Sequence, residues 1–374
     1  MTNIYLIRHA EAEGNFYRIA HGQYNSILTD RGEQQVEALR RRFEDIPIDA
    51  VYSSDLYRTC ATARAIYAAK GLPLQKRADL REVLMGPWEQ MTWGEIERRD
   101  PQQMIYFNKR LDLWHVEGAE TAAQVRDRML AALRDIAAKN PDKTVAVFSH
   151  GAALRITLGT LQGLSLEEIG DTPHGDNTAV SLIEAEGDEL RVVFRDDNSH
   201  LKGALSTFAG QTWWKRPNGI EPGLYFQQVD LKSQGEWLDG CGRELWQLAP
   251  GPGPYDKGTL FREAVERPVL CAYLEGEPLG LVQMNPEKGA AEKQGWISLY
   301  YVLPKFRGQG YGVQLLGQAV KLYRPLGREV LRIALPETTG GKAQQFFSVC
   351  GFRPVENTAD GRQVWEKDIR YKAL

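Results

Sequence analysis

Two residue pairs in the first half of the chain could handle a phosphoryl group. Arg8 and His9 directly follow one short apolar run, and Ser149 and His150 directly follow another. Arginine offers planar, bidentate donors to phosphate oxygens, and histidine can act as a nucleophile or a donor near neutral pH. Arg58 stands one turn into a predicted helix and could join them. Either pair alone would be weak evidence, but their joint placement indicates a phosphate site.

These residues are positioned by a predicted alternation of strands and helices. Apolar runs predict strands at residues 4–7, 49–53 and 144–148, and a helical pattern follows along the chain after each of them. The third run is continuously apolar, which is typical of a strand buried on both faces. The alternation predicts an α/β fold with a largely parallel sheet. Since ligands bind at the carboxyl ends of such strands, both residue pairs occupy favoured places for chemistry.

Helix boundaries in this half carry their own signals. Thr29 or Asp30 is expected to cap the first helix, and Asp30 also suits a capping box. A second helix is predicted over about residues 55–70, and a long amphipathic helix over 121–139. A further helix opens at Gly151, and the N–H groups at its start suit an anion.

The composition is that of an ordinary globular protein. The chain has 374 residues, of which 43% are hydrophobic and 25% charged, and its length suggests two domains. No apolar run is long enough to cross a membrane, and the first residues lack the order of a signal peptide, so no membrane partner is expected. The net charge of -3 argues against nucleic acid or another polyanion as a general partner.

Cysteine usage points to a reducing compartment. The four cysteines lie far apart in the sequence and form no metal-binding pattern, so no metal is expected. We interpret them as reduced thiols and expect a cytoplasmic protein whose chain begins at Met1. The sequence does not predict an oligomeric state.

The chain divides into two dissimilar halves. The first 200 residues carry a net negative charge, and the remainder carries a net positive charge. Domains are predicted at residues 1–202 and 258–374. Between them lies a connecting region at 203–257 that is rich in Gly, Pro and Trp and could also begin the second domain. Further elements in the second half are predicted as strands at 269–274, 279–284 and 296–303 and helices at 310–323 and 342–350.

Several motifs in the first half occur together in one order. They are Leu6-Ile7-Arg8-His9-Ala10-Glu11 with Asn15, Leu28-Thr29-x-x-Gly32, Ser53-Ser54-Asp55-Leu56-x-Arg58, Leu80-Arg81-Glu82 with Gly86-x-Trp88-Glu89, Gly118-x-Glu120-Thr121, and Ser149-His150-Gly151-x-x-x-Arg155. In this order and spacing they resemble the histidine phosphatase superfamily, whose fold is a three-layer, phosphoglycerate mutase-like sandwich. The resemblance covers about residues 1–200 and implies a phosphomonoesterase acting on a small phosphorylated metabolite.

The resemblance also implies a role for each matched residue. His9 would attack phosphorus and become transiently phosphorylated, and Glu82 would protonate the leaving alkoxide and then activate water. His150 completes the catalytic set by helping to neutralise the phosphoryl oxygens. No metal is needed, because fixed cations replace it. The phosphate-binding residues implied are Arg8, Asn15, Arg58 and Gly151.

The main alternative within this family is a phosphoglycerate-type mutase. Cofactor-dependent mutases of the family carry a long insertion after the acid-bearing segment, which keeps the phosphoenzyme away from water. Too few residues separate Glu82 from His150 for such an insertion. An accessible phosphohistidine should hydrolyse, so a phosphatase is favoured over a mutase. A third reading, a phosphate-binding module without chemistry, is disfavoured by the complete residue set.

Glu82 and three histidines of this half would give no functional prediction by residue type alone. Without its flanking motif, Glu82 would be interpreted as a surface carboxylate. His21, His115 and His174 match no motif position and are expected at the rim or surface, with His21 and His174 as options for substrate contact.

A glycine-rich turn in the second half could bind a different phosphate. Residues 307–312 follow a predicted strand and open a predicted helix, so backbone N–H groups could approach an anion closely. The spacing is not that of a dinucleotide-binding fingerprint. Together with Pro304 and Phe346-Phe347-x-x-x-Gly351-Phe352, the turn resembles GNAT-type N-acetyltransferases over about residues 258–370. The resemblance implies an α+β acyltransferase domain that holds acetyl-CoA through Val302, Arg307, Gly308, Gln309, Gly310, Tyr311 and Gly312.

This second resemblance has gaps where the family places catalytic groups. Thr339 begins the segment where members often have an asparagine, and Phe347 stands where many have a proton-donating tyrosine. Ser298 and Leu299 occupy the region where a carboxylate base is often found. The resemblance nevertheless implies acetyl-CoA binding and N-acetylation of a small molecule as the activity of this domain. The alternative is a non-catalytic acyl-CoA-binding or dimerisation module.

Overall fold

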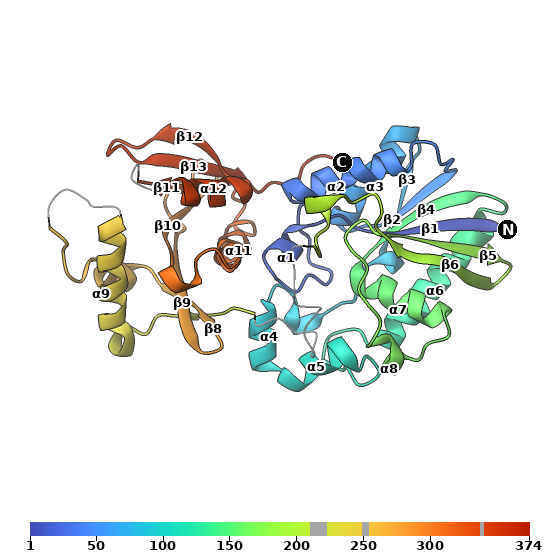
Figure 1. The fold of residues 1–374 in the computed structure, drawn as a ribbon, viewed down its shortest axis with the longest axis horizontal. Coiled ribbons are helices and arrows are strands. Elements are labelled where there is room, and N and C mark those ends of the chain that lie inside the picture. The colour runs from blue at the N-terminus through green and yellow to red at the C-terminus, as the bar shows by residue number, and fades with distance from the viewer. Residues whose placement is uncertain (210–222, 249–253, 337–339) are drawn as a thin grey trace. The chain divides into compact units, whose positions relative to one another are not determined.

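The structure is a computed structural model that describes residues 1–209, 223–248, 254–336 and 340–374. Trp213, Trp214 and Thr339 therefore lie outside the described residues. The chain forms two compact units, each built around its own sheet (Figure 1). The first unit contains Met1–Met91, Ile96–Glu221 and Tyr371–Leu374, and the second contains Thr92–Glu95 and Pro222–Arg370.

A six-stranded sheet forms the centre of the first unit. Its order is β3-β2-β4-β1-β5-β6, in which β3, β2, β4 and β1 are parallel and β5 and β6 are antiparallel. This confirms the predicted, largely parallel sheet, and β4 is buried along nearly its whole length, as its continuous apolar sequence predicts. The strands are β1 (Thr2–Arg8), β2 (Ala50–Ser54), β3 (Leu74–Arg77), β4 (Thr144–Ser149), β5 (Val180–Glu186) and β6 (Glu189–Asp197).

Helices on both faces of this sheet complete the predicted three-layer sandwich. α2 (Asp30–Arg42) and α3 (Tyr57–Lys70) share a buried core with β1, β2 and β4. α6 (Ala122–Lys139) and α7 (Gly151–Leu161) pack against each other on the opposite face (Figure 1). Shorter helices of this part of the chain are α1 (Glu13–Phe16), α4 (Trp93–Arg99), α5 (Pro101–Lys109) and α8 (Leu166–Ile169).

Local chemistry sets the helix ends. The Thr29 hydroxyl accepts a hydrogen bond from Gly32 N at 3.0 Å, so Thr29 caps α2, and Asp30 is already its first helical residue. Of the two predicted caps, Thr29 is therefore confirmed and Asp30 is wrong. α3 begins at Tyr57 rather than near residue 55: its N-cap, Leu56, is extended, and Asp55 pairs with Arg81.

The second unit contains a seven-stranded sheet of order β12-β13-β11-β10-β9-β8-β7, in which only the β10–β11 pair is parallel. The predicted strands and helices of this half are present with small changes at their ends. The strands are β7 (Tyr225–Gln228), β8 (Val269–Leu274), β9 (Glu277–Asn285), β10 (Gln294–Val302), β11 (Val330–Leu335), β12 (Arg353–Asn357) and β13 (Gln363–Asp368). The helices are α9 (Leu231–Leu248), α10 (Thr259–Glu266), α11 (Gly312–Tyr323) and α12 (Gly341–Val349).

β10 and β11 are paired along only part of β10. Their pairing runs from Gln294 to Ile297 and stops there, whereas β10 continues to Val302. The register of β10 against β9 shifts between Ile297 and Leu299, which marks a bulge at Ser298. Past this bulge, Tyr300 lies against Phe346 and Phe347 of α12. Leu299 and Tyr301 pack in the core with α9 and α10.

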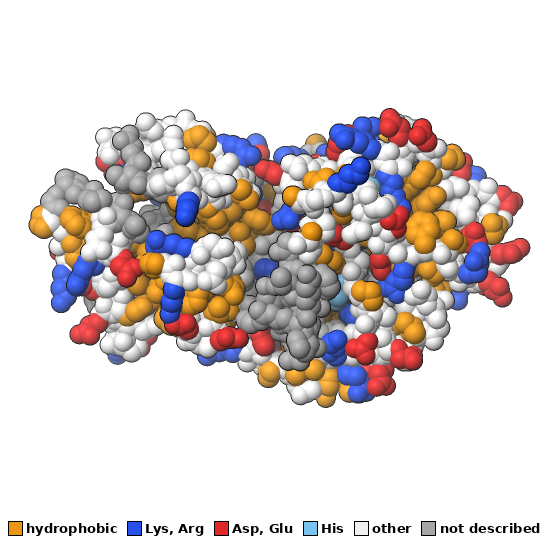
Figure 2. All heavy atoms as spheres, viewed as in Figure 1, with side chains coloured by type: hydrophobic (Ala, Val, Ile, Leu, Met, Phe, Trp, Pro, Cys, Tyr) orange, Lys and Arg blue, Asp and Glu red, His pale blue; other side chains and the backbone are white. Residues whose placement is uncertain are grey.

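The cysteines, the hydropathy of the helices and the surface charges complete the description of the fold. All four cysteines are free and buried. None of the helices in the described ranges combines the length and the apolar character needed to cross a membrane. On the face shown in Figure 2, acidic and basic side chains are interspersed over the first unit.

Candidate functional site

His9 lies just beyond the carboxyl end of β1 and is almost fully buried, with 3% of its surface exposed. Its Nδ1 lies 2.7 Å from the carbonyl oxygen of Ala10. Because a carbonyl can only accept, Nδ1 carries the proton and Nε2 keeps a lone pair. Burial, reinforced by the positive charges of Arg58 and Arg8, lowers the pKa of His9 well below its ordinary value. His9 is therefore a neutral imidazole with an unprotonated nitrogen available for attack.

His150 lies beside His9, with ring centroids 5.3 Å apart, because the parallel pairing of β1 and β4 aligns Arg8 with Ser149. Nε of Arg58 donates to Nδ1 of His150 at 3.1 Å, so Nδ1 is an acceptor. Nε2 then carries the proton and donates to the Ser54 hydroxyl at 2.9 Å. Burial, followed by the charge of Arg58, lowers the pKa of His150 well below its ordinary value. Both histidines are thus neutral at neutral pH.

The buried guanidinium of Arg58 is oriented by the loop of residues 22–24. Its Nη1 donates to the carbonyl of Tyr24 at 2.8 Å, and its Nη2 donates to the carbonyl of Gly22 at 2.7 Å. The loop is fastened in turn by Glu89, whose carboxylate accepts from the N–H groups of Gln23 and Tyr24, each at 2.8 Å. Burial lowers the pKa of Arg58 to about 10, which leaves it charged at neutral pH.

Arg8 presents an unsatisfied donor at the same place. Its Nη1 donates to the carbonyl of Gly175, but its buried Nε has no hydrogen-bond acceptor among the described residues. A Cβ added at Gly151 would lie only 3.3 Å from this Nε, so the glycine keeps the space beside it free. Leaving a buried N–H without a partner costs free energy, and an anionic oxygen at this place would remove that cost.

Glu82 comes from an irregular segment, and its carboxylate lies at the N-terminus of α7. Its Oε2 accepts from Ala152 N at 3.0 Å, and its Oε1 accepts from Ala153 N at 2.9 Å and from Val83 N at 3.0 Å. The first N–H groups of a helix attract negative charge. The structure thus brings Glu82 to the helix that begins directly after His150.

The remaining predicted residues of this half occupy different surroundings. Asn15 lies within α1, its side-chain oxygen accepts from the N–H of the N-cap residue Ala12 at 3.1 Å, and its contact with phosphate stays a prediction. His21, expected at the rim, lies beside His9, with ring centroids 5.9 Å apart. His115 is exposed. Nε2 of His174 lies 3.2 Å from Nη1 of Arg155.

Sequence reasoning assigned no role to several residues that hold these groups. Ser54 and Glu89 were recognised only as motif members, although a hydroxyl and a carboxylate inside catalytic motifs are signals for a supporting contact. Asn177 donates from Nδ2 to the backbone oxygen of His9 at 2.9 Å. Asn177 follows a Gly-Asp pair in an ordinary turn sequence, which gives no sign of this contact.

In the second unit, the glycine-rich turn joins β10 to α11. Gly308 and Gly310 have φ angles of 75° and 84°, in the left-handed region that favours glycine. Within the described ranges, no atom lies within 4 Å of a Cβ built at either position, so the surface of the turn is open. Arg307 holds the turn by donating from Nε to the carbonyl of Val302 at 2.7 Å. α11 begins at Gly312, and the first N–H groups of a helix lack intrahelical acceptors, so these residues fit a pyrophosphate.

An aromatic cluster lies between this turn and α12. Phe347 is buried, and its ring centroid lies 5.4 Å from that of Tyr300. The Tyr300 hydroxyl donates to the carbonyl of Gly312 at 2.8 Å. Burial raises the pKa of Tyr300 well above its ordinary value. The hydroxyl that this aromatic cluster contains is that of Tyr300 on β10.

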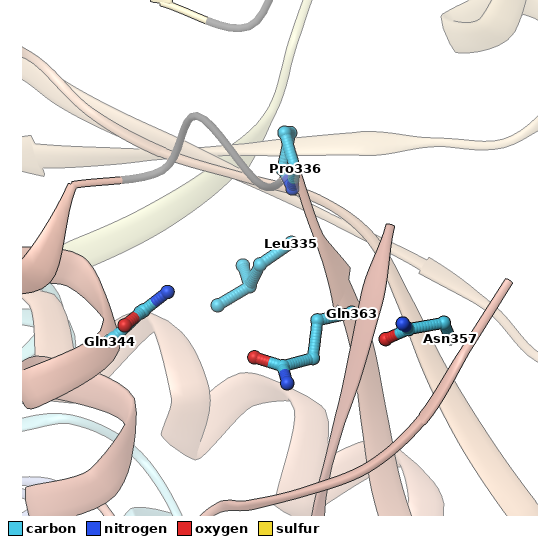
Figure 3. A pocket seen from close by; sticks show the side chains of 5 residues that line it. All are labelled: Leu335, Pro336, Gln344, Asn357 and Gln363. Atoms are coloured by element: carbon cyan, nitrogen blue, oxygen red, sulfur yellow. The ribbon is translucent and has the colours of Figure 1, made fainter. Parts of the chain in front are cut away.

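A small cavity of about 160 Å³ lies at the carboxyl end of β11 (Figure 3). Gln344 points from α12 toward Leu335 and Gln363 of the sheet, and Asn357 lies beyond Gln363 on the neighbouring strand. Gln363 already accepts a hydrogen bond from the Trp365 indole at 3.1 Å. The cavity is lined largely by carboxamides, which suit uncharged polar groups.

Comparison with known families accounts for both halves of the chain. Residues 4–198 match the histidine phosphatase superfamily (branch 1), and residues 235–352 match the acetyltransferase (GNAT) family. Because the first match spans more than half of the chain, the protein belongs to the histidine phosphatase superfamily. It carries a histidine phosphatase domain followed by a GNAT domain, as its motifs predicted.

Individual relatives match the first half. Phosphoserine phosphatase 1 of Hydrogenobacter thermophilus is 29% identical over 186 residues, which are 50% of this chain and 88% of that protein. The probable phosphoglycerate mutase GpmB of Proteus mirabilis is 34% identical over 167 residues, which are 44% of this chain and 76% of that protein. The solved structure of Bacillus stearothermophilus YhfR is 30% identical, with a TM-score of 0.52, and covers 54% of this chain and 99% of its own.

Proposed function

We propose that the first domain is a metal-independent phosphomonoesterase that acts through a phosphohistidine on a small phosphorylated metabolite. The observation that carries the proposal is the state of His9. It is a buried, neutral imidazole whose Nδ1–H is committed to the Ala10 carbonyl, which leaves Nε2 for the phosphorus. Arg58 and Arg8 lie close enough to lower the pKa of His9, and the buried Nε of Arg8 has no hydrogen-bond acceptor among the described residues. These fixed cations would do the work of a metal.

The reaction proposed has two displacements at phosphorus. His9 Nε2 forms a bond to phosphorus while the bond from phosphorus to the substrate oxygen breaks, and Glu82 gives its proton to that oxygen. The oxygen of a water molecule then bonds to phosphorus while the bond from phosphorus to His9 Nε2 breaks, Glu82 takes a proton from that water, and inorganic phosphate leaves. The first step therefore requires Glu82 to hold a proton, and the second step returns it.

A mutase is the second candidate, because a relative that matches this domain is named a probable phosphoglycerate mutase. The two activities differ in the fate of the phosphohistidine. In a mutase the phosphoryl group returns to an organic acceptor, and in a phosphatase it goes to water. The short stretch between Glu82 and His150 supports the phosphatase, since it lacks room for an enclosing insertion.

The second domain is proposed to bind acetyl-CoA through residues 302–312. The positive φ angles of Gly308 and Gly310, the open surface above them and the start of α11 support a pyrophosphate site. Acetyl-CoA would supply an activated acetyl thioester for transfer to a small amine. The lack of a hydroxyl at Phe347 favours a binding role without transfer as the alternative. The four free, buried cysteines support a reducing compartment, and we propose the cytoplasm.

A panel of phosphorylated metabolites, assayed with and without acetyl-CoA, tests both halves on the full chain. Release of inorganic phosphate, with acid-labile label on the wild-type protein and none on His9→Ala, is the expected result. Turnover by a folded His9→Ala protein would remove the covalent mechanism. Interconversion of phosphoglycerates without phosphate release would favour the mutase. Free thiol appearing with an amine acceptor would establish acetyl transfer, and its absence despite acetyl-CoA binding would favour a binding module.

A further inference from the structure

The placement of the proposed general acid needs an explanation, because Glu82 lies outside regular structure. Residues 81–85 form neither helix nor strand. A proton donor has to be held within a fraction of an ångström of its productive position, and irregular segments do not achieve this by themselves. Contacts from outside the segment must therefore fix its backbone.

An ion pair between Glu120 and Arg128 lies against this segment. Nε of Arg128 lies 2.7 Å from Oε1 of Glu120, and Nη2 donates to Oε2 at 2.9 Å, so the two side chains form a bidentate pair. Both are partly buried, with 19% and 20% of the side-chain surface exposed. A bidentate pair in such surroundings has a defined geometry, unlike an exposed pair of flexible side chains.

Hydrogen bonds from both members of this ion pair hold the backbone around Glu82. Arg128 donates from Nη1 to the carbonyl of Arg81 at 2.7 Å and of Asp79 at 3.0 Å, and from Nη2 to the carbonyl of Glu82 at 3.0 Å. Glu120 accepts from Leu84 N at 2.9 Å, and its own N–H donates to the carbonyl of Leu84 at 2.9 Å. Every one of these bonds is made to the main chain, so the pair fixes the path of the segment on both sides of Glu82.

The ion pair itself is anchored to a long, packed helix. Glu120 directly precedes Thr121, which caps α6, and Arg128 lies in the interior of α6. Next to Arg128, the Met129 side chain is fully buried. On the other side of the segment, the Ser149 hydroxyl donates to the carbonyl of Leu80 at 2.8 Å. The segment is therefore held between α6 and the end of β4.

We propose that Glu120 and Arg128 are positioning residues for the proposed acid Glu82. They do not touch the reacting atoms, and they act by fixing the backbone from which the Glu82 carboxyl reaches the phosphate. This inference rests on the proposed function, because it concerns the same proton transfer. The inference requires that loss of the Glu120–Arg128 pair impairs proton transfer from Glu82 more than phosphate binding or attack by His9.

The leaving group provides the readout. Hydrolysis of an alkyl phosphate needs a proton on the departing oxygen, whereas p-nitrophenolate leaves with little protonation. Glu82→Gln should therefore slow the alkyl substrate roughly 100- to 10,000-fold, the range for a lost general acid, and the aryl substrate far less. Arg128→Lys removes the bidentate geometry and several carbonyl contacts. It should lower kcat/KM for the alkyl phosphate about 10- to 100-fold, less than loss of the acid itself, and for p-nitrophenyl phosphate less than about threefold.

A matched control lies on the same helix. Asp135 of α6 pairs with Arg77 at the end of β3, and Asp135→Asn removes this ion pair while it leaves the Arg128 contacts with Arg81 and Glu82 in place. It should leave the ratio of the two kcat/KM values unchanged. Glu120→Gln is the milder companion variant, and it carries the test if Arg128→Lys does not melt cooperatively. The inhibition constant of inorganic phosphate in Arg128→Lys, Glu120→Gln and Asp135→Asn should equal that of the wild type.

The outcomes separate the inference from the proposed function. A wild-type protein that releases phosphate from no monoester would end the proposed function, and the inference with it. If the wild type and Glu82→Gln behave as expected but Arg128→Lys and Glu120→Gln slow both substrates equally, the pair is merely structural and only the inference is overturned. A selective loss with the alkyl substrate, absent in Asp135→Asn, supports it.

Discussion

Arg58 and His150 are joined by one hydrogen bond, from Nε of the arginine to Nδ1 of the histidine at 3.1 Å. The bond makes Nδ1 an acceptor, so the His150 proton resides on Nε2 and points at the Ser54 hydroxyl. The same guanidinium is held by the carbonyls of Gly22 and Tyr24. One side chain thus sets the tautomer of His150 and connects it to the loop of residues 22–24.

Replacing Arg58 by lysine should therefore disturb more than a charge. An ammonium lacks the planar fork, so it cannot serve His150 and both carbonyls at once. We expect Arg58→Lys to lower kcat/KM by about 100-fold or more, because small misplacements in a phosphoryl-transfer site are costly. Steady-state kinetics and the inhibition constant of inorganic phosphate measure the effect. Kinetics within a factor of three of the wild type would contradict it.

Gly22→Ala tests the loop that orients Arg58. A Cβ at Gly22 would lie 1.8 Å from Oε1 of Glu89, so the carboxylate must move away from the N–H groups of Gln23 and Tyr24. We expect kcat/KM to fall by about 10-fold or more, since Arg58 loses its support. Glu89→Gln should produce a loss of the same kind, because an amide replaces one acceptor oxygen with a donor. Wild-type kinetics in both variants would show that the loop does not matter to Arg58.

Folding stability should decline as the pH falls below about 6.5, the ordinary histidine value. In the folded chain, burial lowers the pKa values of His9, His21 and His150 well below their ordinary values, so these rings stay neutral. The unfolded chain takes up protons at these rings below pH 6.5. Unfolding is therefore favoured by up to about 1.4 kcal/mol per pH unit for each such histidine. Urea denaturation at pH 7.5 and 5.5 measures the difference.

Two substitutions give this pH test its contrast. His21→Gln removes one of these three histidines, so the loss of stability between the two pH values should become smaller. His115 is exposed, and His115→Gln should leave that loss as it is in the wild type. An unchanged loss in His21→Gln would mean that this ring is not held neutral by the fold.

Gly310→Leu should prevent binding of acetyl-CoA by the second domain. Leucine at a φ of 84° is strained, and its side chain would stand over the open surface where the pyrophosphate is proposed to lie. Acetyl-CoA at a hundredfold excess over its Kd should stabilise the wild type by about 2.7 kcal/mol and the variant not at all. Calorimetry and thermal melts of the full chain report both effects.

Gly361→Leu is the matched control for that substitution. Gly361 has a φ of 82° and, within the described parts of the chain, nothing within 4 Å of an added Cβ, and it lies in the turn between β12 and β13. It should suffer the same backbone strain and still be stabilised by acetyl-CoA. Equal loss of binding in both variants would mean that strain in the domain, and not the turn itself, abolishes the site.

The sequence alone was sufficient to predict which elements meet at the first site. Apolar runs identified β1, β2 and β4, and parallel strands must place their carboxyl ends at one edge of a sheet. Arg8 and Ser149 are accordingly register partners, which brings His9 and His150 together. The same reasoning found the turn before α11. These predictions depend on local periodicity and on residues next to one another in the chain, which a sequence displays directly.

Tertiary structure alone decided how each of these groups is held. The tautomers of His9 and His150, the unsatisfied Nε of Arg8 and the contact between Arg128 and the carbonyl of Glu82 depend on hydrogen bonds with defined directions. Apart from the bond of His9 to its neighbour, these arrangements involve residues far apart in the sequence. Many of the partners lie in irregular segments, where no periodicity reveals which side chain faces which carbonyl. Hydrogen bonding is directional and short-ranged, so only the folded chain determines it.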